Sequence, residues 1–332
     1  MKNTDVLTIK EMEEPKIKNP DDVLIEVEVA SICGTDVHII EVPPGHPATE
    51  GVILGHEYVG KVLEIGRDVC NLKSGDRVIV DPNITCGYCL YCKSGHPNMC
   101  ENMTTLGIFR NGGFARYNIA PASSLFKVSS NVKPEDAIFA EPLSCVINAL
   151  SKVILFPGQE VLILGAGPIG LYFLLLFKIS GSSLLVVAEI NSYRASFAES
   201  LGANYVIDPR DGEISKQIRK IEGFGVDICV DAIGSLMDVA ISSVKRGGTV
   251  FLFGMNEKAK PKIVQNLITR NEISIFGSFI SNNSYPKTIK IIESGVLPLE
   301  KLITHKISLD EILDGIEIMR SGKAIKVLVY PE

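Results

Sequence analysis

The chain has 332 residues, 46% of them hydrophobic, which is enough for two domains of ordinary size with a core in each. Its formal net charge is −6 and its basic residues are scattered rather than gathered into a stripe, so nucleic acid is not an expected partner. Residues 1–14 lack the apolar run of a secretory signal, and the longest uncharged stretch, 161–177, is shorter than the roughly 20 residues of a membrane-spanning helix, so we expect a cytoplasmic protein with no membrane partner.

Short strands are expected in the first part of the chain. The runs 23–32, 58–66 and 76–80 alternate or are rich in β-branched residues, and turn signals of Gly and Ser-Gly separate them. A cysteine-rich loop follows, and 112–121 is a further strand-like segment. Short strands separated by Gly and Pro predict a compact, barrel-like domain.

The cysteine-rich loop contains four cysteines with the spacing C-x2-C-x2-C-x7-C: Cys86, Cys89, Cys92 and Cys100. Four thiolates can close a tetrahedral shell around one zinc ion and leave no open position, which is typical of a structural site. The alternative is a set of unligated thiols. Three cysteines elsewhere in the chain, Cys70, Cys145 and Cys229, stand among apolar neighbours and are expected in the core.

After the Pro157-Gly158 turn the pattern changes. Six strand-like runs alternate with segments of helical length, and they cover 160–165, 183–189, 203–208, 226–232, 247–254 and 272–278. This alternation predicts consecutive βα units and an α/β fold with a doubly wound, six-stranded parallel sheet of the Rossmann type. The closing stretch predicts helices over 288–295 and 308–322 and a strand over 324–330, and we expect it to return to the first domain.

A dinucleotide-binding fingerprint opens the second half. The sequence G-x-G-x-x-G lies directly after a predicted strand and starts a predicted helix, which makes its residues candidate cofactor contacts: Gly165, Gly167, Pro168, Ile169 and Gly170. Glu189, at the end of the next strand, could accept hydrogen bonds from ribose hydroxyls and repel a 2′-phosphate, which favours NAD over NADP. It could also be a solvated carboxylate, and Arg194 could pair with a 2′-phosphate or cover the adenine ring.

A second set of metal-binding residue types precedes the cysteine loop. Cys33 follows the first predicted strand, and His56 and Glu57 stand just before the next one. A lone Cys or His would usually be structural. Here a thiolate, an imidazole and a carboxylate stand beside glycines at element boundaries, where side chains can converge, so they are candidates for an open metal site.

These features together resemble the zinc-dependent medium-chain dehydrogenases, the superfamily of alcohol, sorbitol and threonine dehydrogenases, over nearly the whole chain. Five elements carry the resemblance: C-G-T-D-V-H at 33–38, G-H-E at 55–57, the four-cysteine loop, A-E-P-L-S at 140–144 and G-A-G-P-I-G at 165–170. The resemblance implies a GroES-like catalytic domain over 1–143, a Rossmann NAD-binding domain over 144–279 and a return to the catalytic domain over 280–332. Relatives usually have an additional β segment before the level of Asp5, so we expect either an incomplete first hairpin or a start of the sequence that is late.

By the same resemblance Cys33 and His56 bind a catalytic zinc ion. Glu57 and Glu141 are the acidic residues beside it, and either could ligate zinc directly or through water. Glu in the E-P motif occurs in the polyol and threonine branches, whereas animal alcohol dehydrogenases have a cysteine ligand there.

The expected chemistry is proton removal coupled to hydride transfer. A cation at an open site makes a bound alcohol more acidic. Thr35 matches the hydroxyl that contacts the substrate oxygen, and His38, whose unperturbed pKa is about 6.5, matches the histidine at the outer end of the proton path. Asp36 is interpreted as a structural hydrogen-bonding residue of this turn.

The substrate cannot be read from these motifs. Sorbitol dehydrogenases carry a Tyr and an Arg where this chain has Ile39 and Ile280, which weakens the case for sorbitol. The candidate substrate contacts are Ile39, Ile280 and Glu141. The variable part of the cleft is expected to be lined by 42–47 and 281–285. Within the first of these segments, His46 is interpreted as a loop histidine without function. Further candidate cofactor contacts lie at the ends of the last two predicted strands: Phe253, Gly254, Ser278 and Phe279.

The sequence thus predicts a zinc-dependent oxidoreductase that transfers hydride from a secondary alcohol to NAD+. The alcohol would belong to a polyol, sugar derivative, diol or hydroxy amino acid, and a threonine 3-dehydrogenase-like activity is an alternative. A non-catalytic nucleotide-binding protein and a zinc-free reductase on the same scaffold are the competing classes. Two zinc ions per chain, NAD, and a homodimer or homotetramer are expected.

Overall fold

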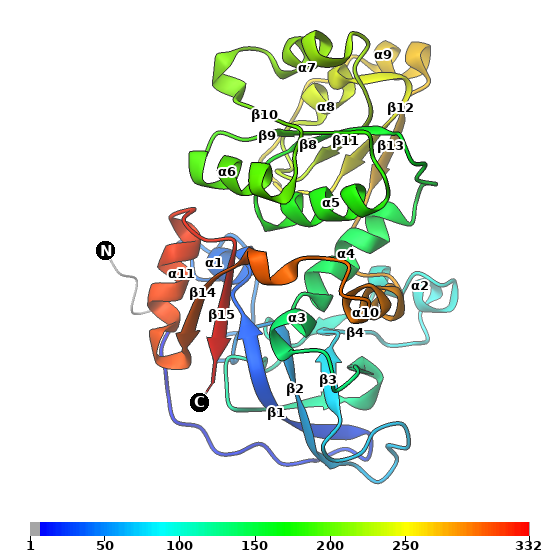
Figure 1. Cartoon of the computed structure of the whole chain (residues 1–332). Coiled ribbons are helices and arrows are strands. Elements are labelled where there is room, and N and C mark those ends of the chain that lie inside the picture. Colours follow the sequence, from blue (N-terminus) through cyan, green and yellow to red (C-terminus); the bar gives the residue numbers. More distant parts are fainter. Residues whose placement is uncertain (1–6, 332) are drawn as a thin grey trace. The chain divides into compact units, whose positions relative to one another are not determined.

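The computed structural model describes residues 7–331 in two compact units (Figure 1). Unit 1 comprises Met1–Ser144 and Ser281–Glu332, and unit 2 comprises Cys145–Ile280. Residues 1–6, the beginning of the segment expected to lack a secretory signal, and residue 332 lie outside the described part. The C-terminal segment therefore belongs to the same unit as the N-terminal half.

Unit 1 is built on a seven-stranded sheet in the order β14-β15-β1-β2-β3-β7, with β6 paired to β1. The strands are β1 (Asp22–Ser31), β2 (Glu57–Ile65), β3 (Arg77–Val80), β6 (Tyr117–Pro121), β7 (Leu125–Lys127), β14 (Ile303–Ser308) and β15 (Lys326–Tyr330). β14 and β15 are parallel, and the other neighbours are antiparallel. A separate two-stranded sheet pairs β4 (Asn83–Ile84) with β5 (Thr104–Thr105).

The alternation in β1 builds the core of unit 1. Val23, Ile25 and Val27 are buried along one face of the strand, where they pack in one cluster with residues such as Tyr58 and Val78. The helices of unit 1 are α1 (Gly34–Ile39), α2 (Leu90–Lys93), α3 (Pro134–Ala137), α10 (Tyr285–Glu293) and α11 (Ile312–Arg320). α4 (Ala140–Leu150) begins in unit 1 and continues into unit 2.

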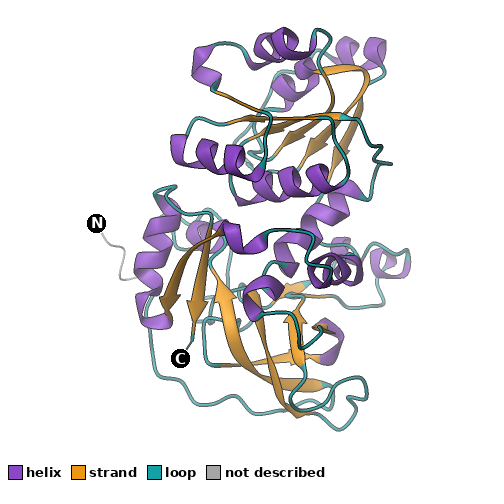
Figure 2. Cartoon of the chain, viewed as in Figure 1, coloured by secondary structure: helices purple, strands orange, loops and turns teal. Residues whose placement is uncertain are grey.

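Unit 2 is a six-stranded sheet in the order β10-β9-β8-β11-β12-β13, with every neighbouring pair parallel. Its strands are β8 (Glu160–Leu164), β9 (Leu184–Ala188), β10 (Tyr205–Ile207), β11 (Val226–Asp231), β12 (Val244–Leu252) and β13 (Ser274–Gly277). Its helices are α5 (Pro168–Ile179), α6 (Ser192–Leu201), α7 (Ile214–Glu222), α8 (Met237–Ser243) and α9 (Gln265–Asn271). Figures 1 and 2 show α5 and α6 on one face of the sheet and α7 and α8 on the other, the arrangement of a doubly wound Rossmann fold.

Most of the predicted elements form. Each of the six runs of the second half overlaps a strand, and two of the closing segments contain α11 and β15. The third closing segment, 288–295, overlaps α10, which begins three residues earlier at Tyr285. The strand expected over 112–121 covers only its second half, because Gly112 and Gly113 pack against the backbone of Gly55 and the ring of Tyr58. Among the described residues no helix combines the length and apolar character needed to cross a bilayer.

One expectation about the cysteines was wrong. Cys145 and Cys229 are buried as predicted, but Cys70 is exposed. It lies in the loop between β2 and β3, where its neighbours Val69 and Leu72 turn inward to the core of unit 1. The apolar neighbours of Cys70 therefore fill the core, while the thiol faces outward.

Candidate metal and cofactor sites

The four-cysteine loop forms a compact cluster of sulfurs. The Sγ atoms of Cys86, Cys89, Cys92 and Cys100 lie within 4.8 Å of one another, although they come from a loop and two short helical turns. Backbone N–H groups point at the sulfurs: Cys86 N lies 3.3 Å from the Cys100 Sγ, and Cys89 N lies 3.4 Å from the Cys86 Sγ. Donors of this kind favour the thiolate form.

The protonation preferences of this cluster fit a bound dication. Partial desolvation opposes ionisation of Cys86, but N–H groups of Tyr88 and Cys89 lower its pKa to about 6. Desolvation and the neighbouring thiols raise the pKa of Cys92 to about 12. Four adjacent thiolates repel one another unless a cation lies between them, so the donor set suits Zn²⁺ in a closed tetrahedral site.

The second cluster lies where three strands of unit 1 end together. Ser31, the last residue of β1, pairs with Glu57 of β2 and with Leu328 of β15. Cys33 follows β1 and His56 precedes β2, so the antiparallel register brings both to one end of the sheet. Ligand atoms of Cys33, His56 and Glu57 lie within 4.8 Å of one another.

Asp36 orients this cluster more directly than the sequence suggested. Its side chain is fully buried, its Oδ2 accepts a hydrogen bond of 2.8 Å from the Cys33 backbone N–H, and its Oδ1 lies 3.5 Å from Nδ1 of His56. Within residues 7–331, neither of the facing atoms, Asp36 Oδ1 and His56 Nδ1, has another hydrogen-bond partner. An imidazole held through Nδ1 presents Nε2 to a metal, the usual way in which a carboxylate orients a histidine ligand.

The charges around His56 compensate for its burial. Burial pulls the imidazole pKa down, but the adjacent Cys33 and Asp36 outweigh it and raise the pKa of His56 well above its ordinary value. Burial, followed by the charge of Glu57, raises the pKa of the Cys33 thiol. A soft thiolate, an imidazole and a carboxylate at one point fit zinc, and three protein ligands leave a position open.

Glu57 is held by two residues that the sequence analysis did not single out. Its Oε2 accepts hydrogen bonds from the Ser31 hydroxyl and from the Lys326 ammonium group, and all three side chains are buried. Burial opposes ionisation, but Lys326 and His56 lower the pKa of Glu57 below its usual range. Ser31 and Lys326 therefore keep Glu57 an ionised acceptor beside the metal ligands.

Glu141 stands apart from this three-residue cluster. It lies in the first turn of α4 and is not among the ligand atoms that converge within 4.8 Å. Desolvation and then the charges of Glu57 and Asp81 raise the pKa of Glu141 to about 7. Asp81 itself was not predicted, and burial raises its pKa to about 6 against the hydrogen bond it accepts from Asn83.

The predicted proton-path residues lie on α1. Thr35 Oγ1 is 3.7 Å from the Cys33 sulfur, which puts the hydroxyl beside the metal ligands. The His38 side chain lies one turn further along and is 60% exposed. His46 bonds within its own loop, where its Nδ1–H donates to the Pro47 carbonyl oxygen at 2.8 Å.

In unit 2 the Gly-rich turn joins β8 to α5. Gly165 has a φ of 97°, and a Cβ on Gly170 would lie 1.9 Å from the Gly165 carbonyl oxygen, so both positions require glycine. A Cβ on Gly167 would meet nothing within 4 Å. Pro168 and Ile169 form the first turn of α5, whose N-terminal N–H groups suit a pyrophosphate.

Glu189 follows β9 and braces this turn. It is buried, with Oε2 accepting 2.7 Å from the Ala166 N–H and Oε1 accepting 2.8 Å from the Asn191 N–H. It lines a cavity of about 760 Å³ together with Ile190, Pro209 and Ile233. The Nε of Arg194, in the first turn of α6, is buried and has no hydrogen-bond partner among the described residues. A cavity with an acceptor at one wall fits the adenosine half of a dinucleotide.

The remaining candidate cofactor and substrate residues mostly pack against, or form hydrogen bonds with, other residues of the protein. Phe253 packs edge-to-face on Phe173, with ring centroids 5.2 Å apart, and the N–H groups of Phe253 and Gly254 donate to Asp231. Asn148 donates to the Ser278 hydroxyl and to the carbonyls of Phe279 and Ile280. Ile39 is buried in the core of unit 1. Ile280 has a left-handed φ of 39°, unusual for a β-branched residue.

Known proteins match both units. Residues 19–130 match the alcohol dehydrogenase GroES-like domain, and residues 168–294 match the zinc-binding dehydrogenase family. D-arabinitol dehydrogenase 1 of Uromyces fabae is 33% identical over 94% of this chain and 90% of its own length. Sorbitol dehydrogenase of Bacillus subtilis (strain 168) is 32% identical over 100% of this chain and 96% of its own length. L-threonine 3-dehydrogenase of Pyrococcus furiosus is 34% identical over 96% of this chain and 93% of its own length.

Solved structures agree on the fold. A putative zinc-binding dehydrogenase of Sinorhizobium meliloti 1021 bound to NADP has a TM-score of 0.90 at 33% identity, covering 95% of this chain and 94% of its own. A short chain alcohol dehydrogenase of E. coli CFT073 complexed with NADH has a TM-score of 0.88 at 28% identity, covering 95% and 94%. With full-length relatives at this identity and the metal-ligand clusters in place, the chain belongs to the zinc-binding medium-chain alcohol dehydrogenase family, whose members are zinc-dependent NAD(P) alcohol and polyol dehydrogenases.

Proposed function

We propose that this protein oxidises a secondary alcohol with NAD+ at a zinc site formed by Cys33, His56 and Glu57. The observation that carries the proposal is the convergence of these three ligand atoms within 4.8 Å. They lie in a chain whose second unit carries the Gly-rich turn and acidic residue of a dinucleotide site. Glu141, outside the convergent set, would act on the metal through water.

The residues around the site have complementary tasks. Zinc, when bound, makes an alcohol more acidic and so favours loss of its proton before hydride leaves for the nicotinamide. Asp36 orients His56, and Lys326 with Ser31 orients Glu57. Thr35, next to the Cys33 sulfur, receives the alcohol proton through its hydroxyl, and the exposed ring of His38 passes it to water.

NAD+ rather than NADP+ is the proposed cofactor. Of the two similar structures named above, one is bound to NADP and the other to NADH, so the cofactor preference is argued from the residues of this chain's own cavity. Glu189 borders the cavity of about 760 Å³, whose lining also includes Glu213 and Asp238 against a single cation, Lys262. With three carboxylates and one lysine the charged side chains of the lining are net negative, which disfavours the additional negative charge of a 2′-phosphate.

The substrate class follows the polyol and threonine branches of the family. D-arabinitol, sorbitol and L-threonine dehydrogenases all lie at 32–34% identity, so no single one of these names transfers to this chain. Ile39 is apolar and buried, so it offers the substrate no polar anchor. We therefore propose a polyol, sugar derivative, diol or hydroxy amino acid as the substrate, with a threonine 3-dehydrogenase-like activity as the second candidate.

A substrate panel tests this proposal. Sugar alcohols and their phosphates, inositols, 2,3-butanediol and threonine would be assayed for formation of NADH and NADPH. We expect turnover of at least one secondary alcohol with NAD+, and a kcat/KM at least about 10-fold lower with NADP+. Tight NADH binding without turnover of any compound would favour the non-catalytic alternative.

Variants test the metal site itself. Cys33→Ser and His56→Ala should each lose one zinc ion per chain and lower kcat at least about 1,000-fold, because the electrophile is lost. Cys70→Ser is the matched control for Cys33→Ser, since Cys70 is exposed and outside both clusters. Full turnover in either ligand variant would refute the assignment.

A homodimer or homotetramer is also proposed. β10 and β13 are the two edge strands of the unit 2 sheet, and an edge can pair with the same edge of a second copy across a two-fold axis. Sedimentation equilibrium should give a mass of two or four chains, and a monomer at micromolar concentration would contradict the proposal. The cytoplasmic location stays a prediction.

A further inference from the structure

A carboxylate is paired with the proposed proton-relay histidine. Nδ1 of His38 lies 3.1 Å from Oε1 of Glu41, three residues further along the chain. Glu41 is the one carboxylate of the described residues within 4.0 Å of that ring. An ionised carboxylate can only accept, so the ring nitrogen facing it must carry the hydrogen.

The turn after α1 is shaped around this pair. The N–H groups of Glu41 and Gly45 both donate to the His38 carbonyl, at 3.3 and 2.9 Å. A Cβ on Gly45 would lie 2.6 Å from Oε2 of Glu41 and 3.4 Å from Cβ of His38. The loop therefore folds back onto both side chains, and the glycine leaves the space that the carboxylate occupies.

We propose that Glu41 is the positioning residue of His38. By accepting from Nδ1–H it fixes the neutral imidazole in one tautomer and leaves Nε2 as the nitrogen that takes a proton. The inference rests on the relay role of His38 in the proposed function. In one turnover the alcohol gives hydride to NAD+ and its proton, through the Thr35 hydroxyl, to Nε2 of His38. The resulting imidazolium releases that proton to water and returns to the same tautomer.

Folding stability alone does not explain this arrangement. The two side chains are 60% and 41% exposed, and exposed ion pairs contribute little to stability. Removal of Glu41 should therefore leave the unfolding temperature unchanged while it changes the tautomer of the His38 ring. This makes a direct spectroscopic test possible.

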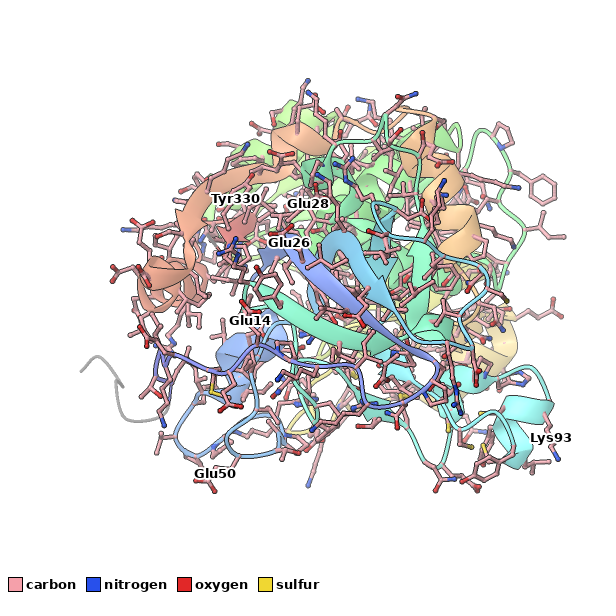
Figure 3. The ribbon with its side chains drawn as sticks, turned by 90° about the horizontal axis from the view of Figure 1, so that it is seen from below. Glu14, Glu26, Glu28, Glu50, Lys93 and Tyr330 are labelled. Carbon is pink, nitrogen blue, oxygen red and sulfur yellow. The ribbon has the colours of Figure 1, made fainter. Side chains whose placement is uncertain are left out.

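The test reads the tautomer by nitrogen NMR of the ¹⁵N-histidine-labelled zinc enzyme, with His38 signals assigned by their loss in His38→Gln. We expect the Nδ1–H tautomer in the wild type and a shift toward Nε2–H in Glu41→Ala. Glu41→Gln keeps an acceptor oxygen and should retain the wild-type tautomer. Gly45→Ala, which displaces the carboxylate without removing it, should reproduce the effect of Glu41→Ala. Glu50→Ala is the matched control, because Glu50 is exposed and points outward from its loop (Figure 3).

Kinetics connect the tautomer to turnover. Glu41→Ala should lower kcat about 10-fold, a part of the 10²–10⁴-fold that a positioned proton-transfer group supplies, with KM for NAD+ unchanged. An unchanged tautomer in Glu41→Ala would overturn the proposal. A shifted tautomer with unchanged kcat would overturn the positioning role as well, while the zinc and NAD+ assignment would stand. If the proposed function itself is wrong, the wild-type enzyme will show no zinc-dependent alcohol oxidation, while the tautomer of His38 can still be measured in it. Failure of the proposed function and failure of the Glu41 proposal can therefore be distinguished.

Discussion

At the residue scale, the metal site depends on glycines that carry no ligand. Gly55, just before His56, has a φ of 89°, and its backbone is covered by two other glycines. A Cβ on Gly112 would lie 2.2 Å from the Gly55 carbonyl oxygen, and one on Gly107 would lie 2.4 Å from its carbonyl carbon. The loop that holds His56 can therefore lie where it does only because these contacts are backbone against backbone.

We expect Gly112→Ala to weaken the catalytic metal site. The added methyl group displaces the Gly55-His56 backbone, and a displacement of about 1 Å in a ligand or reacting group costs on the order of 100-fold in rate. Zinc content and kcat would be measured against Gly277→Ala, because an added Cβ at Gly277 would meet nothing within 4 Å and its backbone is not left-handed. Unchanged zinc content and kcat in Gly112→Ala would mean that the close packing does not position His56.

The site residues that could be predicted from the sequence are those whose side-chain type is typical of metal ligands. Cys33, His56 and Glu57 stand out because thiolate, imidazole and carboxylate groups lie beside glycines. Ser31 and Lys326 were missed because a serine in a strand and a lysine 269 positions from Glu57 carry no local signal. Only the pairing of β1 with β2 and β15 brings them together.

At the element scale, the central strands of unit 1 are joined by a charged side-chain network. Glu28 of β1 accepts two hydrogen bonds from the Arg77 guanidinium of β3, at 2.6 and 2.9 Å, and lies 3.2 Å from the Lys61 ammonium of β2. Figure 3 shows Glu26 and Glu28 on β1. Burial opposes ionisation, but Arg77 and Lys61 outweigh it and hold the pKa of Glu28 below its ordinary value.

This network should stabilise the fold in a pH-dependent way. Because the folded-state pKa of Glu28 is lower than the unfolded value of about 4.3, its stabilisation is present above that pH and is lost as pH falls through the folded pKa. Glu28→Gln should therefore cost about 1–2 kcal/mol at pH 7, seen as a lower unfolding temperature, and much less at pH 3. Glu26→Gln is the control, since its ion pair with Arg116 is long, at 3.8 Å, and exposed. An equal or larger effect of Glu28→Gln at pH 3 would contradict this account.

The success of the sequence predictions also varied with element length. The six alternating runs of unit 2 carry strong periodicity, and each overlaps the strand predicted there. α1, only six residues long and beginning with Gly34 and Thr35, reads as a turn in the sequence, because its stability comes from Asp36 accepting the Cys33 N–H rather than from helix propensity. β14 was missed because its strand conformation depends on pairing with β15.

At the scale of the whole molecule, the four-cysteine lobe should depend on its metal. None of the residues of α2 is buried, and of the 3₁₀ turn Pro97–Met99 only Asn98 is, so the lobe has almost no apolar core of its own. Cys89→Ser should lose one zinc ion and raise amide exchange over 86–100 at least about 10-fold, with unit 2 unaffected. Hydrogen exchange read by mass spectrometry tests this, with Cys229→Ser as a buried cysteine outside the cluster. Undiminished protection over 86–100 would show that the lobe folds without the ion.

The measurement that tests the central claim most directly is anomalous diffraction at the zinc edge from crystals of the active, NADH-bound enzyme. We predict two peaks per chain, one enclosed by the four cysteines and one in contact with Cys33, His56 and Glu57. An active crystal without a peak at Cys33, His56 and Glu57, or with these side chains turned away from one another, would contradict the assignment of zinc-assisted alcohol oxidation.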